Sequence, residues 1–329
     1  MLKGGAAAQL FLKPPLQRGS RDVDLVTRLD KDHVVGYLAE LQAKFDGSGM
    51  EVKPYAPKGP VVELPLVTYE VYFEPLTYKA IFGSNGRQDY IKLEVLSEDV
   101  EIPTTIVEEK ETPALKVRNL RCVTLGALSG DKLTTLASKT TGVLPEEQPK
   151  QLYDIDNIVF GNDLTKEDVE QMLQTFDKLS KIELGFKRRK ETPIGVLEDI
   201  IATLDAFSKA DLASGDREIR GLIRDFEGTY VSRKAAVSAS GWSARALRVK
   251  FLAGLMKLSI EGEMDEAGLA DTLARAKRLS GSLEESDRKL QEQLLGYAKG
   301  PRELKGKPPS RLFWEVVNAS NIEELEKLV

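Results

Sequence analysis

The sequence predicts an α+β protein whose N-terminal part forms a mixed β-sheet and whose C-terminal part forms a helical bundle. Strand-like and helix-like segments alternate up to about residue 160. From about Leu164 onward, apolar residues recur at spacings of three and four, which is the period of an amphipathic helix. We therefore expect two domains, over residues 1–160 and 161–329, and two is also the usual number for a chain of 329 residues.

The composition is that of an ordinary globular protein. Hydrophobic residues make up 41% of the chain and charged residues 30%. The net charge is −5 and the sequence pI about 5.4, so the overall charge does not indicate a nucleic-acid-binding protein. A local basic groove remains compatible with an acidic protein.

Cysteine and histidine are each present once, which narrows the possible chemistry. Cys122 excludes an internal disulfide and a cysteine-based zinc cluster, and its segment LRCVTLG is typical of a buried strand. His33 is expected at the surface in the first turn of a helix, and a single histidine excludes mechanisms that need a pair. No apolar run reaches the roughly 18 residues of a membrane span, and no signal peptide is evident, so we expect a cytoplasmic protein.

The N-terminal elements follow from alternating and periodic apolar residues. Pro65 predicts a bend within residues 59–73, and SNGR at 84–87 predicts a hairpin turn. A helix is expected to begin after Ser129-Gly130 in SGDKLTTLASKT. The remaining predicted strands are 22–28, 90–97 and 114–125, and the remaining helices are 31–45 and 151–160.

The C-terminal half predicts about six to eight helices joined by short polar or glycine-containing links. Thr165 followed by Asp168 is close to a capping box and marks the start of the first helix. Trp242 and Trp314 are expected in the core, with base stacking as an alternative for Trp242. The basic run at 185–191 is interpreted as a solvated helix end or, alternatively, as an RNA contact.

Acidic residues on two predicted strands point to a metal site. Asp22 and Asp24 are two residues apart, so their side chains share one face of their strand. Glu94 lies on the strand IKLEVLS with Lys92 on the same side. Mg²⁺ prefers oxygen ligands together with substrate phosphates, so these carboxylates are candidate ligands for one or two ions, with Mn²⁺ as an alternative.

Two glycines near the start of the chain are candidates for phosphate binding. Gly4 and Gly5 precede Ala6-Ala7-Ala8, where a helix is expected to begin. Glycines let backbone N–H groups approach an anion at the positive end of a helix. Glycines for phosphate and carboxylates for metal together fit a nucleoside triphosphate.

Four segments of the N-terminal part together resemble a known family. KGGAAAQLF followed by RGSRDVDLV resembles the opening of the nucleotidyltransferase-fold toxins of the AbiEii family, which includes the MenT toxins. SGDKLTTLASKTTG resembles the family helix that offers a lysine to the triphosphate, and PKQLYDIDNIV resembles the segment RDLYDL. The resemblance covers about residues 3–160. Two departures are a very short first strand and Gln151 in place of the arginine.

The resemblance implies a fold, an activity and a set of site residues. It implies a nucleotidyltransferase-fold catalytic domain, and an enzyme that transfers a nucleotide from an NTP to RNA, with tRNA as the expected acceptor and a cognate antitoxin as partner. DNA and membranes are not expected as partners. The implied catalytic residues are Asp22, Asp24, Lys132 and Asp154, the implied nucleotide contacts are Gly4, Gly5, Ser20 and Arg21, and the implied metal ligands are Asp22, Asp24 and Glu94.

Simpler interpretations remain open for most of these residues. Asp22 and Asp24 could be solvated on an edge strand, Glu94 could pair with Lys92, and Lys132 could be a surface charge. Asp154 could cap a helix. Ser20 could order a turn, and Arg18 and Arg21 could be solvated rather than bound to phosphate or RNA.

The sequence is also compatible with two alternatives to the RNA-directed enzyme. The same metal site could transfer a nucleotide to a protein hydroxyl or a small molecule. The chain could also be a regulatory protein that binds an NTP without catalysis.

Overall fold

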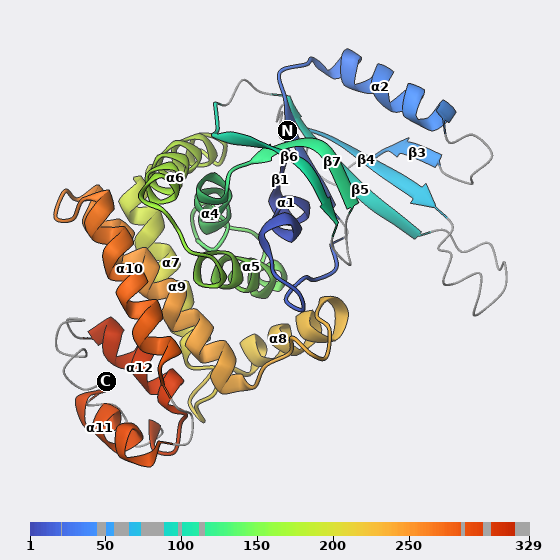
Figure 1. Ribbon diagram of the computed structural model, residues 1–329. Helices are drawn as coiled ribbons and strands as arrows, with labels where there is room; N and C mark the ends of the chain where they lie inside the picture. The colour runs from blue at the N-terminus through green and yellow to red at the C-terminus, as the bar shows by residue number, and fades with distance from the viewer. Residues whose placement is uncertain are drawn as a thin grey trace, which may run out of the picture. The chain divides into compact units, whose positions relative to one another are not determined.

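The computed structural model describes residues 1–20, 22–44, 51–55, 66–73, 89–97, 101–111, 116–283, 287–298 and 304–319. The chain divides into two compact units (Figure 1). Unit 1 comprises Met1–Leu10 and Gly19–Val123, and unit 2 comprises Phe11–Arg18 and Thr124–Val329. These compact units divide the chain after Val123. The boundary between functional domains at residue 160 stays a prediction.

Unit 1 is built on a mixed sheet, which in the described residues has seven strands in the order β3-β4-β5-β2-β1-β7-β6. β1 pairs antiparallel with β2 and parallel with β7, and β2 pairs parallel with β5. The other neighbours are antiparallel. The strands are β1 Leu2–Lys3, β2 Asp22–Thr27, β3 Glu51–Pro54, β4 Leu66–Phe73, β5 Asp89–Ser97, β6 Thr104–Glu111 and β7 Lys116–Val123.

The predicted strands over 22–28, 90–97 and 114–125 are confirmed as β2, β5 and β7. β3 and β6 were not predicted, and β6 shows why, because seven of its eight residues are exposed and no buried face produces an alternation. β4 and β5 pair antiparallel, as the two strands of a hairpin do. The expected bend at Pro65 and the turn at 84–87 lie outside the described residues.

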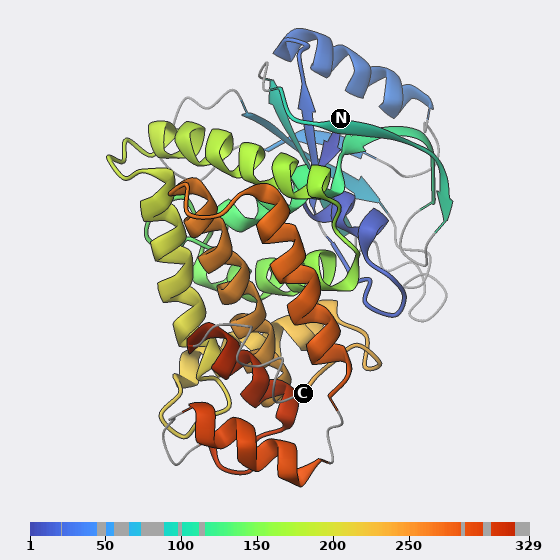
Figure 2. The same ribbon diagram turned by 60° about the vertical axis from the view of Figure 1, so that its left-hand side comes forward.

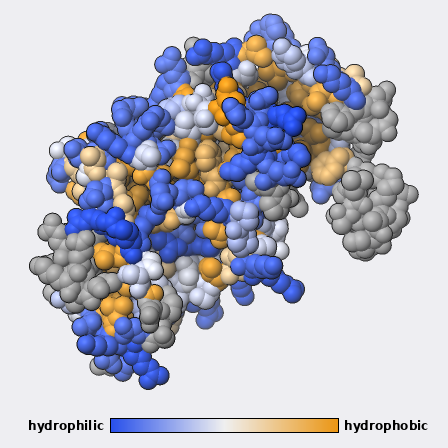
Figure 3. All heavy atoms as spheres, viewed as in Figure 1, coloured by the Kyte–Doolittle hydropathy of each residue, from blue (hydrophilic) through white to orange (hydrophobic). Residues whose placement is uncertain are grey.

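Helix α2 (Lys31–Lys44) covers one face of the sheet. Val34 and Leu38 of this helix pack with Tyr69 and Val95 of β4 and β5. Val95 is one residue from Glu94, so the apolar face under α2 is opposite to the face that carries Glu94. Hydrophobic residues gather beside α2 on the otherwise largely hydrophilic face drawn in Figure 3. His33 is exposed in the first turn of α2, as predicted, and its ring contacts Asp30 over 2.8 Å.

Unit 2 is helical in its described residues. α9 is central and contacts α5, α7, α10 and α12, and Figure 2 shows α7, α9 and α10 side by side. The helices are α4 Leu125–Thr134, α5 Gln148–Gly161, α6 Lys166–Phe186, α7 Pro193–Ser208, α8 Arg217–Tyr230, α9 Ala239–Ile260, α10 Glu266–Gly281, α11 Arg288–Ala298 and α12 Pro309–Ala319, with a 3-10 turn η1 at Pro145–Glu147.

The helical half agrees with the periodicity of the sequence. Thr165 and Asp168 form the predicted capping box at the start of α6. Trp242 and Trp314 are fully buried, so both belong to the core and Trp242 offers no free ring for base stacking. In unit 1, Cys122 is also fully buried, and burial raises the pKa of its thiol. No helix in the described ranges is long and apolar enough to span a membrane.

The start of α4 differs from the prediction. The helix was expected to open after Ser129-Gly130, but it begins at Leu125, and Ser129 and Gly130 lie inside it. The reason is the cap, because the Thr124 hydroxyl accepts a hydrogen bond from the Ala127 amide over 3.3 Å. Gly130 is instead a packing residue, since a Cβ there would lie 2.4 Å from the Met172 carbonyl oxygen.

Replacing Gly130 with alanine should therefore destabilise the protein. The added methyl group would collide with the backbone of α6, and overpacking of this kind costs about 1–3 kcal/mol. Gly254→Ala in α9 is the matched control, because its Cβ would meet nothing within 4 Å and alanine is the better helix former. Urea unfolding of both variants measures the difference, and equal midpoints would contradict the close packing of α4 on α6.

Candidate active site

A tight turn joins β1 to α1 (Gly4–Phe11) and lies beside β2. Gly4 has a φ of +64°, and a Cβ added there would lie 1.8 Å from Oδ2 of Asp24. Both the left-handed conformation and the close approach require glycine. The Gly5 amide donates a hydrogen bond to Oδ2 of Asp24 over 3.3 Å. Unit 1 thus brings the predicted Gly4 and Gly5 together with Asp24.

The predicted acidic residues share one face of the sheet. In the parallel pair of β2 and β5, Asp22 is opposite Lys92 and Asp24 is opposite Glu94. Because side chains alternate along a strand, all three carboxylates lie on the same face, together with Lys92. β2 is an interior strand between β1 and β5, so the edge-strand alternative for Asp22 and Asp24 is wrong. Both aspartates are half-buried.

The acidic residues of this sheet face are candidate donors for a divalent cation. Across the described ranges, no three His, Cys, Asp or Glu side chains are arranged as a ready metal cage. The predicted set of three carboxylates is therefore not an assembled ligand set, and Asp24 contacts the Gly5 amide instead. Mg²⁺ commonly binds through one or two carboxylates, substrate phosphates and water. Two aspartates on one strand face beside a glycine turn fit that mode.

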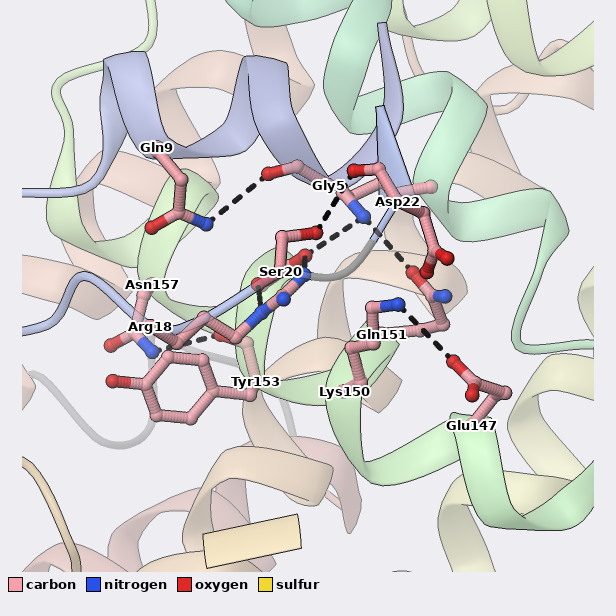
Figure 4. A network of polar contacts seen from close by, with 12 residues as sticks. Gly5, Gln9, Arg18, Ser20, Asp22, Glu147, Lys150, Gln151, Tyr153 and Asn157 are labelled. Atoms are coloured by element: carbon pink, nitrogen blue, oxygen red, sulfur yellow. Dashed lines mark hydrogen bonds and ion pairs between the residues drawn. The ribbon is translucent and has the colours of Figure 1, made fainter. Parts of the chain in front are cut away.

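Ser20 orders the start of β2. Its hydroxyl donates to the Asp22 carbonyl oxygen over 3.1 Å (Figure 4). This contact fits the simpler interpretation of Ser20, in which its hydroxyl orders the turn before β2. On α1, the side-chain amide of Gln9 donates from Nε2 to the Gly5 carbonyl oxygen over 3.2 Å and so holds the first turn of the helix (Figure 4). Arg21, a predicted nucleotide contact, lies outside the described residues.

In unit 2, Arg18, Lys132 and Asp154 form a buried ion-pair cluster. Asp154 accepts from Nε and Nη2 of Arg18 over 2.6 and 2.5 Å, and from Nζ of Lys132 over 2.8 Å. The Lys132 ammonium also donates to Oε1 of Gln151 over 3.0 Å. Gln151 and Asp154 are three residues apart on α5, so both reach Lys132 from one face of the helix. The three charged side chains are at most 4% exposed.

The electrostatics of the cluster keep Asp154 ionised. Burial by itself would raise the pKa of this carboxyl, but Arg18 and Lys132 outweigh burial and hold the pKa below its usual range. For Arg18, burial acts in the opposite direction, yet the contact with Asp154 raises its pKa. Two cations against one carboxylate leave the cluster with one net positive charge.

The lowered pKa of Asp154 predicts a loss of stability in acid. A carboxyl whose pKa is depressed on folding stabilises the protein above its unfolded pKa, here near 3.8, and that stability is lost as the pH falls toward the lower folded pKa. The stability difference between wild type and Asp154→Asn should therefore narrow below about pH 4. Urea unfolding between pH 3 and 6 measures it, with the exposed Asp89→Asn as control. A difference independent of pH would contradict the ionised, paired state.

Several simpler interpretations are corrected by the structure. Lys132 is not a helix-surface charge, because it is only 3% exposed. Asp154 is not a helix cap, because it lies in the interior of α5. Arg18 is not solvated, because it is 2% exposed and bonded to Asp154. The run at 185–191 spans the C-terminal end of α6 at Phe186 and is exposed, although Nζ of Lys187 donates to the Thr141 and Gly142 carbonyl oxygens.

Some residues that build this region were missed by sequence reasoning. The sequence suggested Arg18 as a contact to phosphate or RNA or as a solvated residue, whereas its partner Asp154 is 136 positions away. The sequence places it at the head of RGSRDVD but gives no signal for that pairing. Asp156, two residues after Asp154, accepts from Arg248 over 2.5 and 2.8 Å and lies 3.3 Å from Arg245. Arg245 also stacks on Tyr153, with 4.7 Å between the guanidinium carbon and the ring centroid.

These features define a class of protein. A mixed sheet, a short strand that turns through two glycines into a helix, and aspartates on the adjacent strand are the arrangement of a nucleotidyltransferase fold. The helical residues that follow agree with the predicted helical bundle.

The comparison with protein families is consistent with that class. The family described as nucleotidyl transferase AbiEii toxin, Type IV TA system, matches residues 1–238, and the chain therefore belongs to this family. Membership makes the protein a nucleotidyltransferase toxin of a toxin–antitoxin system, with an NTP as substrate and a cognate antitoxin. No curated protein and no solved structure gives a significant match.

Proposed function

We propose that this toxin transfers a nucleoside monophosphate from an NTP to an RNA acceptor, and that the acceptor is the 3′ end of tRNA in the cytoplasm. Added nucleotides there would block aminoacylation and stop translation. The observation that supports the reaction is the close approach of the Gly4–Gly5 turn to Asp24. It sets backbone amides that suit phosphate beside a carboxylate that suits a metal. The RNA acceptor rests on the resemblance to the MenT toxins.

The proposal assigns unit 1 to the triphosphate. Asp22 and Asp24 would hold Mg²⁺ or Mn²⁺, which neutralises phosphate charge and makes the attacking hydroxyl more acidic. The amides of Gly4 and Gly5, at the positive end of α1, would orient a phosphate once the Gly5 amide exchanges its bond to Asp24 for a phosphate oxygen, with Arg21 as a further contact. Glu94, next to Asp24 in the sheet, would complete the metal shell or accept the proton of the attacking hydroxyl.

The proposal assigns Lys132 to the leaving group. Its ammonium would stabilise the charge that develops on pyrophosphate, and Asp154 would position it. The excess of one positive charge among Arg18, Lys132 and Asp154 supports this role, because it favours a developing anion nearby. Asp154 is thus a positioning residue that acts through Lys132.

A transfer assay tests the proposal directly. The purified protein is incubated with total tRNA, Mg²⁺ and each of the four NTPs labelled at the α-phosphate, and label is expected in tRNA. Chelation of the metal should abolish labelling, and added Mg²⁺ or Mn²⁺ should restore it. Periodate-treated tRNA, which lacks the 3′-terminal diol, is the control for the acceptor end and should stay unlabelled. Label on protein would favour a protein acceptor, and no label on any macromolecule would favour a non-catalytic NTP-binding protein.

A further inference from the structure

Helix α8 separates its charged and apolar residues onto different faces. Arg217, Arg220 and Arg224 follow one another at intervals of three and four, so they lie along one side of the helix. Ile223 and Phe226 are buried and belong to the core of unit 2. The three arginines thus form a row along one side of a helix that Ile223 and Phe226 anchor to the core of unit 2.

The row lines a surface pocket that lies within unit 2. The pocket has a volume of about 460 Å³, and its other walls are the apolar residues Ala210, Ile223, Val237, Ala239 and Trp242. Glu227 is the only carboxylate among its lining residues, and its Oε1 accepts from the Trp242 indole over 2.8 Å and from the Val237 amide over 3.1 Å. Three cations therefore face one carboxylate that already serves two donors.

Within the described residues, no ion pair joins the arginine row to a carboxylate, and the other acidic residues of α8 and its cap, Asp216, Glu218 and Asp225, are not among the residues that line the pocket. Arg220 donates to the carbonyl oxygens of Leu212 and Gly215 over 3.2 and 2.9 Å, which fixes the guanidinium without cancelling its charge. Arg217 and Arg224 are exposed and form no hydrogen bond or ion pair with any described residue. The pocket lining, with three arginines and one carboxylate, therefore carries a local excess of positive charge that suits an anionic ligand.

We propose that the arginine pocket of α8 binds the phosphate backbone of an RNA strand, the acceptor in the proposed function on which this inference rests. Arginine presents a planar fork that matches phosphate oxygens. From Arg217 to Arg224 the helix rises about 10 Å, so the row is long enough to contact successive phosphates of one strand. Trp242 is fully buried in the pocket wall, so the contact reads charge rather than bases.

RNA binding without any NTP tests the pocket. The full chain is titrated against a fluorescent single-stranded oligonucleotide of mixed sequence at several salt concentrations. Arg217→Ala combined with Arg224→Ala should weaken binding by about tenfold and reduce the slope of log affinity against log salt by about 1.4, or 0.7 for each lost phosphate contact. The matched control is Arg278→Ala with Arg288→Ala, which removes two exposed arginines of the same unit and should change affinity by less than about twofold.

The outcomes separate this inference from the proposed function. A pocket variant with wild-type affinity and salt slope, or an equal loss in the control variant, overturns the pocket as an RNA site. If polyglutamate competes more strongly than poly(U), and the pocket variant loses this competition, the pocket binds an acidic protein partner. That result also overturns the pocket as an RNA site. Pocket-dependent RNA binding without transfer to tRNA supports the pocket and discards the proposed reaction. Transfer to tRNA together with RNA binding that does not depend on the pocket supports the proposed reaction and overturns the pocket.

Discussion

Replacing Asp24 or Asp22 with asparagine is expected to lower the rate of nucleotidyl transfer by about a thousandfold, with the fold intact. Each change removes one negative charge from the proposed metal ligands, and a catalytic metal contributes several kcal/mol to transition-state stabilisation, at about 1.4 kcal/mol per factor of ten. Asparagine keeps an oxygen that can accept the Gly5 amide, so the turn beside Asp24 should persist. Initial rates of label incorporation into tRNA measure the effect.

The control for this experiment lies in the same sheet. Asp89→Asn on β5 makes the same chemical change at an exposed position, where the side chain accepts only from the Tyr90 amide among its described contacts. Its transfer rate should stay within about twofold of wild type. Folding of each variant is checked by circular dichroism and urea unfolding. A folded Asp24→Asn protein with a wild-type transfer rate would show that Asp24 is not a residue of the active site.

Replacing Asp154 with alanine is expected to cost about 3–5 kcal/mol of unfolding free energy. The change leaves Arg18 and Lys132 buried and close together with no carboxylate between them. Breaking a buried pair by removing one partner is strongly destabilising, because the remaining charge is uncompensated. Urea unfolding measures the loss. Asp205→Ala on α7 is the control, since Asp205 is 46% exposed in its pair with Lys250 and should cost less than about 1 kcal/mol.

Lys132→Met separates stability from catalysis within the ion-pair cluster. Methionine keeps most of the apolar stem, and Asp154 keeps its two bonds to Arg18, so the loss of stability should be smaller, about 1–2 kcal/mol. The transfer rate should nevertheless fall by at least about a hundredfold, if Lys132 stabilises the leaving group. A folded Lys132→Met protein with full activity would leave the cluster a purely structural role.

The burial of Lys132 changes how its proposed role must be understood. A surface lysine could reach a phosphate by moving its flexible side chain, but an ammonium bound to Asp154 and Gln151 is held in one position. Such a group contributes through a fixed charge, and a preorganised charge costs little reorganisation during the reaction. Gln151, which stands where the family pattern has an arginine, keeps a contact with Lys132 without adding a third cation.

Much of the fold was predictable because the relevant signals are local. The repeat of apolar residues over 166–281 predicts helices without any knowledge of their partners, and α6, α7, α8, α9 and α10 appear where the period indicates. The same is true of Asp22 and Asp24, since alternation along one strand decides that they share a face. β6 was missed because an exposed edge strand leaves no such pattern.

Errors arose where packing between distant segments overrode a local signal. Gly130 suggested a helix start, but it allows the backbone of α6 to approach α4. Lys132 and Asp154 suggested a surface charge and a cap as alternatives, but their mutual contact and that of Arg18 with Asp154 join residues 22 and 136 positions apart. A charge pattern in the sequence does not reveal which ions become partners after burial.

The order of residues alone determined the classes of element, the shared face of two aspartates and a match to one toxin family, because these depend on spacing within short segments. Only the folded chain decided that Gly4 lies against Asp24, that Glu94 stands opposite Asp24, and that Lys132 is enclosed with Arg18 around one carboxylate. Strand register and the burial of charge are set by contacts between segments far apart in the chain. Their free energies depend on the whole environment rather than on neighbouring residues.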